Sequence, residues 1–135
     1  MIAVDTSVAV AAALPWHEAH APVRTALPRG KTRLLAQVAV ETYSVLTRLP
    51  PPQRVATAVA RDYLKETFLL PSIALSPEGY DRLLELAVTE SISGGAVYDA
   101  LVAATAEEAG ATLFTLDRRA TETYRLLRID YEVLG

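Results

Sequence analysis

The sequence of 135 residues contains no cysteine. Disulfide bonds, thiolate metal sites and a cysteine nucleophile are therefore excluded. No apolar run reaches the roughly 18 residues that a membrane-spanning helix needs. The apolar N-terminal segment is interrupted by Asp5 and has no basic leader, which argues against a secretion signal. These absences predict a protein of the cytoplasm with no membrane partner.

An excess of basic charge is also missing. The chain has 13 basic and 16 acidic residues and a formal net charge of -3, which is not the basic balance of a typical nucleic-acid binder. Its only lysines are Lys31 and Lys65, so the remaining basic residues are arginines, which suit bidentate phosphate contacts. With 51% hydrophobic residues the chain can bury a core, and we expect one domain over residues 1–135.

Short apolar runs alternate with helical patterns along the whole chain, which predicts an α/β fold with a mainly parallel sheet of four to five strands. Ser76-Pro77 has the form of a helix N-cap followed by proline at the first helical position. Helices are expected after each of the first four strands. The expected strands cover residues 1–4, 33–36, 69–75, 111–116 and 129–134.

Four acidic residues stand close to predicted strand ends. Asp5 follows the first strand and Asp117 follows the strand at residues 111–116. Asp99 opens the helix that leads into that strand, and Glu41 lies on the rim of the apolar face of the helix after the second strand. Because the carboxyl ends of parallel strands share one edge of a sheet, we expect the four acids to converge there. For Asp5 alone, a simple N-cap is an equally good explanation.

A cluster of carboxylates needs compensation. Two carboxylates about 5 Å apart repel by roughly 3 kcal/mol at an effective dielectric near 20, so a cluster takes up protons or binds cations. Ligation by oxygen alone favours Mg²⁺ or Mn²⁺ over Zn²⁺. Such an ion activates water and neutralises charge on a phosphoryl group. The acids therefore predict metal-dependent phosphoester hydrolysis.

Other polar residues suggest roles around these acids. Arg48 is a plausible partner for Glu41 or for a substrate phosphate, and Arg118 and Arg119 follow the last acid as possible phosphate contacts. His17 and His20 have the i, i+3 spacing of a metal pair. Because no third ligand is near them in the sequence, an exposed helix face is the better interpretation.

The segments around the acids resemble those of PIN-domain ribonucleases, and the size and layout of the chain resemble the VapC toxins of bacterial toxin-antitoxin pairs. The resemblance covers nearly the whole chain, with the run of prolines at residues 50–52 as a departure. The matching segments are I-A-V-D-T-S at Asp5, V-A-V-E-T-Y-S-V-L at Glu41, V-Y-D-A-L-V-A-A-T-A at Asp99 and L-F-T-L-D at Asp117.

The resemblance implies a three-layer α/β/α sandwich in which the four acids hold Mg²⁺ or Mn²⁺ and orient the water that attacks structured RNA. It implies that Thr6, Ser7 and Thr115 are hydroxyl side chains that hydrogen-bond beside the acids. It also implies a homodimer, an RNA substrate such as transfer or ribosomal RNA, and inhibition by a VapB-type antitoxin.

Other functions fit parts of the sequence. A haloacid-dehalogenase-type phosphatase needs a second aspartate where this chain has Ser7. A response-regulator receiver needs paired acids near the first strand and a late lysine, and the last lysine here is Lys65. A Mg²⁺-dependent phosphatase for small molecules and a catalytically silent PIN-like module that binds protein or RNA remain as alternatives.

Overall fold

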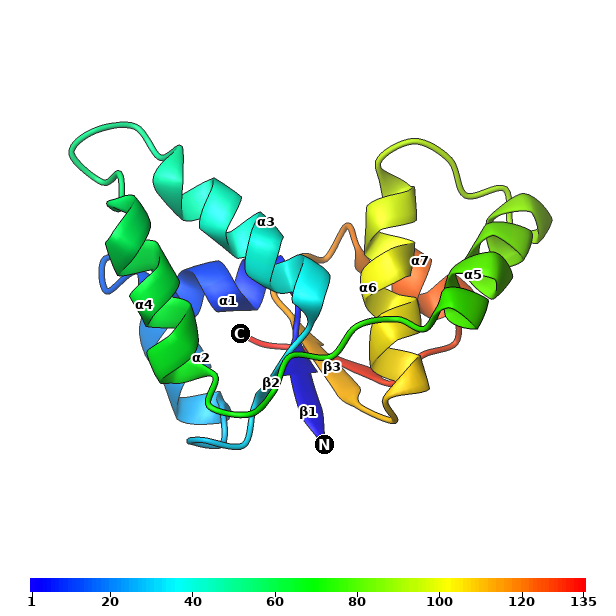
Figure 1. Ribbon diagram of the computed structural model, residues 1–135, viewed down its shortest axis with the longest axis horizontal. Coiled ribbons are helices and arrows are strands. Elements are labelled where there is room, and N and C mark those ends of the chain that lie inside the picture. Colours follow the sequence, from blue (N-terminus) through cyan, green and yellow to red (C-terminus); the bar gives the residue numbers. More distant parts are fainter.

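A computed structural model describes all residues from 1 to 135, and its centre is a sheet of four parallel strands in the order β2-β1-β3-β4 (Figure 1). Val4 pairs with Leu34 on one side and with Phe114 on the other, and Thr115 pairs with Val133. The carboxyl ends of β1 and β3 therefore lie next to each other. The strands are β1 (Ile2–Val4), β2 (Arg33–Leu34), β3 (Thr112–Thr115) and β4 (Tyr131–Val133).

Seven helices cover the sheet in two groups. Contacts join α1 to α2 and α3, and α3 to α4, whereas α6 contacts both α5 and α7. Figure 1 shows the first group on one side of the sheet and the second on the other, which confirms the predicted three-layer sandwich. The helices are α1 (Thr6–Ala13), α2 (His20–Ala26), α3 (Ala36–Thr47), α4 (Thr57–Thr67), α5 (Pro77–Thr89), α6 (Ala96–Glu108) and α7 (Thr121–Leu126).

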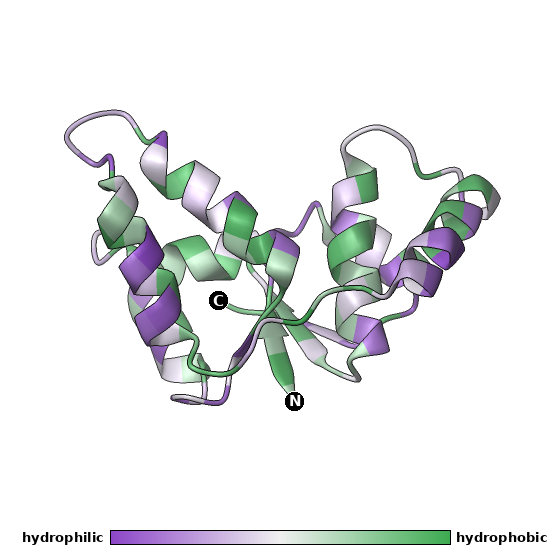
Figure 2. Ribbon diagram, in the orientation of Figure 1, coloured by the Kyte–Doolittle hydropathy of each residue, from purple (hydrophilic) through white to green (hydrophobic).

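The core lies between the sheet and both helical groups. One cluster of 24 buried residues joins strand residues such as Val4 and Leu113 to small side chains of α1 and α6, including Ala9 and Ala103. Alanine at these positions lets the helices pack closely on the strands. Figure 2 shows the hydrophilic segments mainly on the outward parts of α4 and α5. No helix is both long enough and apolar enough to cross a membrane.

One predicted strand does not form. The segment at residues 69–75 makes only an isolated parallel bridge, between Ile73 and Leu35. The Ile73 N–H donates to the Leu34 carbonyl at 3.0 Å, and the Ile73 carbonyl accepts from the Ala36 N–H at 2.8 Å. Pro71 has no N–H to extend this pairing. The sheet therefore has four strands, the lower of the two numbers expected.

Two helix starts also differ from the prediction. His17 was expected on one helix face with His20, but residues 15–19 form turns and bends, and α2 begins only at His20. Pro22 therefore lies in the first turn of α2, where proline is tolerated. Helix α6 begins at Ala96, so Asp99 lies inside its first turn and does not open it. The predicted start of α5 is confirmed, because the Ser76 hydroxyl accepts from the Gly79 N–H at 3.0 Å.

Candidate active site

Asp5 is both the N-cap of α1 and a neighbour of the other acids. It follows β1 directly and caps α1, where its Oδ1 accepts from the Val8 N–H at 3.3 Å and from the Ser7 hydroxyl. Its Oδ2 accepts from the Tyr124 hydroxyl at 2.9 Å. The carboxyl group is buried, and this burial raises its pKa, while hydrogen bonds from Ser7, Thr115 and Tyr124 act in the opposite direction. Asp5 is therefore fixed by donors on all sides.

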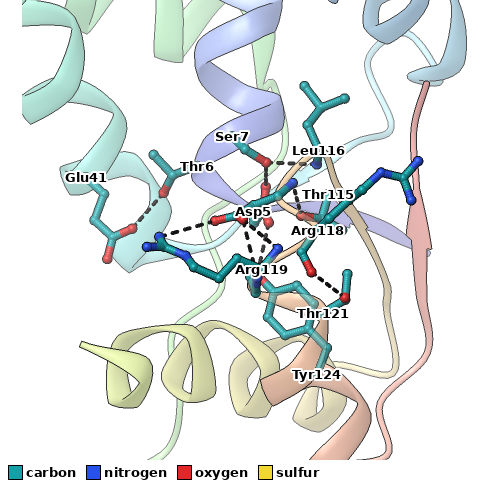
Figure 3. Close-up of polar contacts among 12 residues, drawn as sticks. Asp5, Thr6, Ser7, Glu41, Thr115, Leu116, Arg118, Arg119, Thr121 and Tyr124 are labelled. Atoms are coloured by element: carbon teal, nitrogen blue, oxygen red, sulfur yellow. Dashed lines mark hydrogen bonds and ion pairs between the residues drawn. The ribbon is translucent and has the colours of Figure 1, made fainter. Parts of the chain in front are cut away.

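Glu41 is held by two side chains, one from α1 and one from its own helix α3. The Thr6 hydroxyl donates to its Oε2 at 2.6 Å, and the Gln37 amide donates to its Oε1 (Figure 3). The predicted pairing of Glu41 with Arg48 is wrong. Arg48 lies two helical turns further along, beyond the reach of a direct ion pair, and its guanidinium donates to the Ser44 hydroxyl at 3.3 Å.

Asp117 follows β3 and organises the turn before α7. Its Oδ1 accepts from the backbone N–H groups of Arg119 at 3.0 Å and Ala120 at 3.3 Å, and its own N–H donates to the Thr115 hydroxyl at 3.0 Å. The Arg119 guanidinium lies 3.8 Å from Oδ2. Asp117 is thus oriented by the backbone and keeps one oxygen facing an arginine.

Asp99 shows that the four acids share one site. Burial raises the pKa of its carboxyl group, and the negative charges of Asp117, Asp5 and Glu41 raise it further, while Arg119 lowers it. No hydrogen bond contributes to this balance. Asp99 is consequently the half-buried acid of the cluster that has no donor to compensate its charge.

The donor chemistry of the cluster suits a hard divalent cation. No three histidine, aspartate or glutamate side chains are close enough to form a ready-made set of ligands. Mg²⁺ does not need one, because it is usually held by one or two carboxylates, keeps several waters and completes its shell with substrate phosphate. The residues fit such an ion through their mutual negative charge and their oxygen donors.

The three predicted hydroxyl residues all contact this cluster. Thr6 bonds to Glu41, and Thr115 lowers the pKa of Asp5. Ser7 donates to Asp5 while its oxygen accepts the Leu116 N–H at 2.9 Å, so it connects the ends of β1 and β3. Figure 3 shows Ser7 and Thr115 beside Asp5, and Thr6 pointing to Glu41.

Sequence reasoning missed two residues that hold the acids. Gln37 precedes Glu41 by four residues on one helix, a spacing at which side chains meet, so this contact had a detectable signal. Tyr124 lies 119 residues from Asp5 in the sequence, and no local pattern indicates that its hydroxyl reaches the acid. Its pKa is raised by burial and by the charge of Asp5.

A comparison with protein families gives a match to the PIN domain over residues 2–126, which include all four acids. The chain belongs to the PIN-domain family. As a PIN-domain protein it is 48% identical over 134 residues to ribonuclease VapC40 of Mycobacterium tuberculosis, a match that covers 99% of each chain. It is a homologue of the VapC ribonucleases over its whole length.

Solved structures share the fold of this PIN domain. The FitAB toxin-antitoxin complex bound to a DNA fragment matches 98% of this chain and 94% of that chain, with a TM-score of 0.75 and 17% identity. The VapC20 toxin of Mycobacterium tuberculosis, described as cleaving the sarcin-ricin loop, matches 90% of this chain and 94% of that chain, with a TM-score of 0.70 and 17% identity. At these identities the likeness concerns the fold.

Proposed function

We propose that this PIN-domain protein is a Mg²⁺- or Mn²⁺-dependent endoribonuclease of the cytoplasm that hydrolyses phosphodiester bonds in structured RNA. The observation that carries the proposal is Asp99, a half-buried carboxylate beside three other acids and without a hydrogen-bond donor. Such a group is stabilised when a cation arrives. The homology to VapC40, a ribonuclease by name, supports RNA as the substrate.

In this proposal Asp99 and Asp117 supply oxygens to the ion, because each keeps an oxygen free of hydrogen bonds. A divalent cation supplies neutralisation of the phosphodiester charge and lowers the pKa of water. Glu41 faces the same position with its carboxylate fixed by Thr6 and Gln37, which suits it to orient the attacking water and accept its proton. Asp5 maintains the negative potential and holds Ser7 in place.

RNA approaches an acidic site only if cations guide its phosphates. Arg118 and Arg119 are exposed, and Figure 3 shows their side chains extending to opposite sides of the cluster. Arg48 is exposed at the end of α3. We propose these three arginines as phosphate contacts. A relative that cleaves the sarcin-ricin loop makes ribosomal RNA a substrate to test first, with transfer RNA beside it.

We also propose a VapB-type antitoxin as an inhibitory partner and a homodimer as the assembly. The similarity to the FitAB complex supports the antitoxin. The exposed apolar side chains of Tyr80, Leu84 and Val88 recur every four residues along α5, which supports an interface on that helix. Light scattering that reports a monomer at micromolar concentration would contradict the dimer.

The nuclease is tested with purified protein and a mixed pool of transfer and ribosomal RNA, in Mg²⁺, in Mn²⁺ and in EDTA. We expect discrete fragments with either metal and none with EDTA. Asp99→Asn should reduce cleavage by a factor of 100 or more, since it removes a charge that acts directly in the metal site.

The matched control is Asp81→Asn, which makes the same chemical change at an exposed position of α5 outside the cluster. It should cleave like the unmodified protein. Metal-dependent cleavage retained by Asp99→Asn would overturn the proposed site. A folded protein that binds RNA but cleaves nothing in any metal would favour the silent binding module.

A further inference from the structure

A cavity of about 700 Å³ opens beside the acidic cluster. Thr6 and Ser7 belong to its lining, and these same residues hydrogen-bond to Glu41 and Asp5. These two hydroxyl residues therefore connect the lining of the cavity to the acids. None of the four acids lines either this cavity or a larger one of about 800 Å³ between α2 and α4, but only the smaller cavity is lined by residues that hydrogen-bond to the acids. The smaller cavity is the one placed to act together with them.

The lining of this cavity has two kinds of surface. Apolar side chains from α1, α3 and the segments after β3 and β4 form its walls, and they are half-buried. His17, Glu18 and Arg118 add polar groups. The apolar lining residues, including the rim residues of α2, are Val10, Ala19, Pro22, Val45, Leu116 and Leu134. Apolar walls with a few polar groups are the usual composition of a small-molecule site.

The polar groups have definite hydrogen-bonding capacities. The Nδ1 atom of His17 accepts the Ala19 N–H at 3.0 Å, so the neutral ring carries its proton on Nε2 and offers a donor. The Glu18 carboxylate is an acceptor at an exposed position. The Arg118 side chain extends away from the acids, on the side opposite to Arg119 (Figure 3). A donor, an acceptor and a cation thus surround an apolar hollow.

We infer that this cavity binds the base of a single-stranded ribonucleotide next to the phosphate that is cleaved. The apolar walls receive the flat face of the base, His17 and Glu18 meet its polar edge, and Arg118 contacts its phosphate. The inference rests on the proposed nuclease function, because it takes the acids as the place of cleavage. It makes the cavity a determinant of which sequence is cut, and it gives His17 a role that its spacing to His20 does not provide.

The first test measures binding without cleavage. Trp16 is the only tryptophan of the chain, and although it lines a neighbouring cavity, its ring centroid lies 6.3 Å from that of His17, so its fluorescence should respond when a ligand contacts His17. We expect the four nucleoside 5′-monophosphates, added in EDTA, to give a saturable change that differs between bases. His17→Ala and Arg118→Ala should each weaken binding about tenfold.

Matched controls are His20→Ala and Arg125→Ala, which remove the same chemical groups outside the cavity lining. Both should bind nucleotides like the unmodified protein. Equal binding by all five proteins, or no saturable change in the unmodified protein, would overturn the inference. Thermal melting with and without Mn²⁺ confirms that each variant is folded and still responds to metal.

The second test uses a cleaved oligonucleotide in which each base near the cut is removed in turn. One abasic position should lower kcat/KM about tenfold in the unmodified protein, mainly through KM. In His17→Ala, the abasic and the intact substrate should have nearly the same kcat/KM, because removing the base and removing the side chain abolish the same interaction. If the losses in kcat/KM from His17→Ala and from the missing base multiply, the two act independently. That result would overturn the inference even if cleavage by the unmodified protein is normal.

The outcomes also separate this inference from the nuclease proposal. Nucleotide binding that depends on His17 without any metal-dependent RNA cleavage would contradict the nuclease and keep the cavity as a nucleotide site. Normal cleavage with no nucleotide binding would support the nuclease and overturn the cavity as a nucleotide site. Variants that bind and cleave normally but escape inhibition would assign the cavity to the antitoxin and overturn its assignment to RNA.

Discussion

Asp5 is a carboxyl group kept inside the protein by its neighbours. Burial alone raises its pKa, and the hydrogen bonds from Ser7, Thr115 and Tyr124 reduce that cost by stabilising the charged form. Each of these three donors comes from a different element, namely α1, β3 and α7. The charge at this point therefore depends on correct packing of α1, β3 and α7 together.

Tyr124→Phe tests this dependence at the level of one atom. The ring stays and only the hydroxyl that donates to Asp5 Oδ2 at 2.9 Å is lost. Since this is a buried hydrogen bond to a charged acceptor, we expect the free energy of unfolding to fall by about 2 kcal/mol. Urea denaturation followed by circular dichroism measures it. Tyr98→Phe on the exposed part of α6 is the control, and an equal loss there would contradict the argument.

The residues of the site were predictable to the extent that they belong to local patterns. Asp5 and Asp117 follow strand ends, and Thr6 and Ser7 stand directly after Asp5, so adjacency in the sequence places them. Tyr124 reaches the site only through the packing of α7 against α6, and Arg48 points elsewhere because two helical turns separate it from Glu41. Contacts of this kind follow from tertiary packing, which has no periodic signal.

Among the helices, α5 has the most explicit sequence signal for its start. The Ser76 hydroxyl accepts from the Gly79 N–H, donates to Glu108 Oε1 and so ties α5 to the end of α6. The bond from the Ser76 hydroxyl, and a second one from the Ser76 N–H, lower the pKa of the exposed Glu108. One hydroxyl therefore caps a helix and connects two neighbouring helices.

Ser76→Ala removes both contacts. We expect a loss of about 1 kcal/mol in the free energy of unfolding, the usual cost of losing an N-cap. The pKa of Glu108 should rise toward its ordinary range, which NMR titration of its side chain detects. Ser93→Ala in the exposed loop before α6 should change neither quantity. An unchanged Glu108 titration in Ser76→Ala would show that the hydroxyl does not govern it.

The bounds of an element were predicted well where the sequence has both a capping residue and a clear helical spacing of apolar residues. They were predicted less well where only apolar composition was available. The N-cap and proline at Ser76-Pro77 fix α5, whereas the apolar segment at residues 69–75 has the composition of a strand but pairs at one residue only. The prediction that Asp99 opens its helix is wrong, because the backbone is already helical from Ala96. Apolar composition alone does not determine how many ladder bonds a segment forms.

The molecule as a whole concentrates negative charge at one edge of its sheet. The pKa of Asp99 lies above its ordinary 3.8 because of burial and the neighbouring acids. The folded state therefore binds the proton more tightly than the unfolded chain does. The resulting stabilisation is present below the unfolded pKa and is lost as the pH rises through the raised pKa of the folded state.

Asp99→Asn should accordingly raise the melting temperature of the metal-free protein at pH 7 by about 2–5 °C, and the gain should shrink toward pH 4. The unmodified protein should gain stability on addition of Mn²⁺, and the variant should gain much less. Scanning fluorimetry across pH, with and without Mn²⁺, measures both effects. An identical response to Mn²⁺ in the two proteins would count against Asp99 as a ligand.

The hydrogen bond between Asp5 and Tyr124 joins the first strand of the chain to its last helix. Asp117 also lies far from Asp5 in the sequence, so the acidic cluster forms only when distant segments of the chain have packed together. A chain in which α7 has not yet docked lacks the donor to Asp5 and the settled turn at Asp117, so its acidic site is incomplete. The condition of the site therefore reports on the packing of the whole fold.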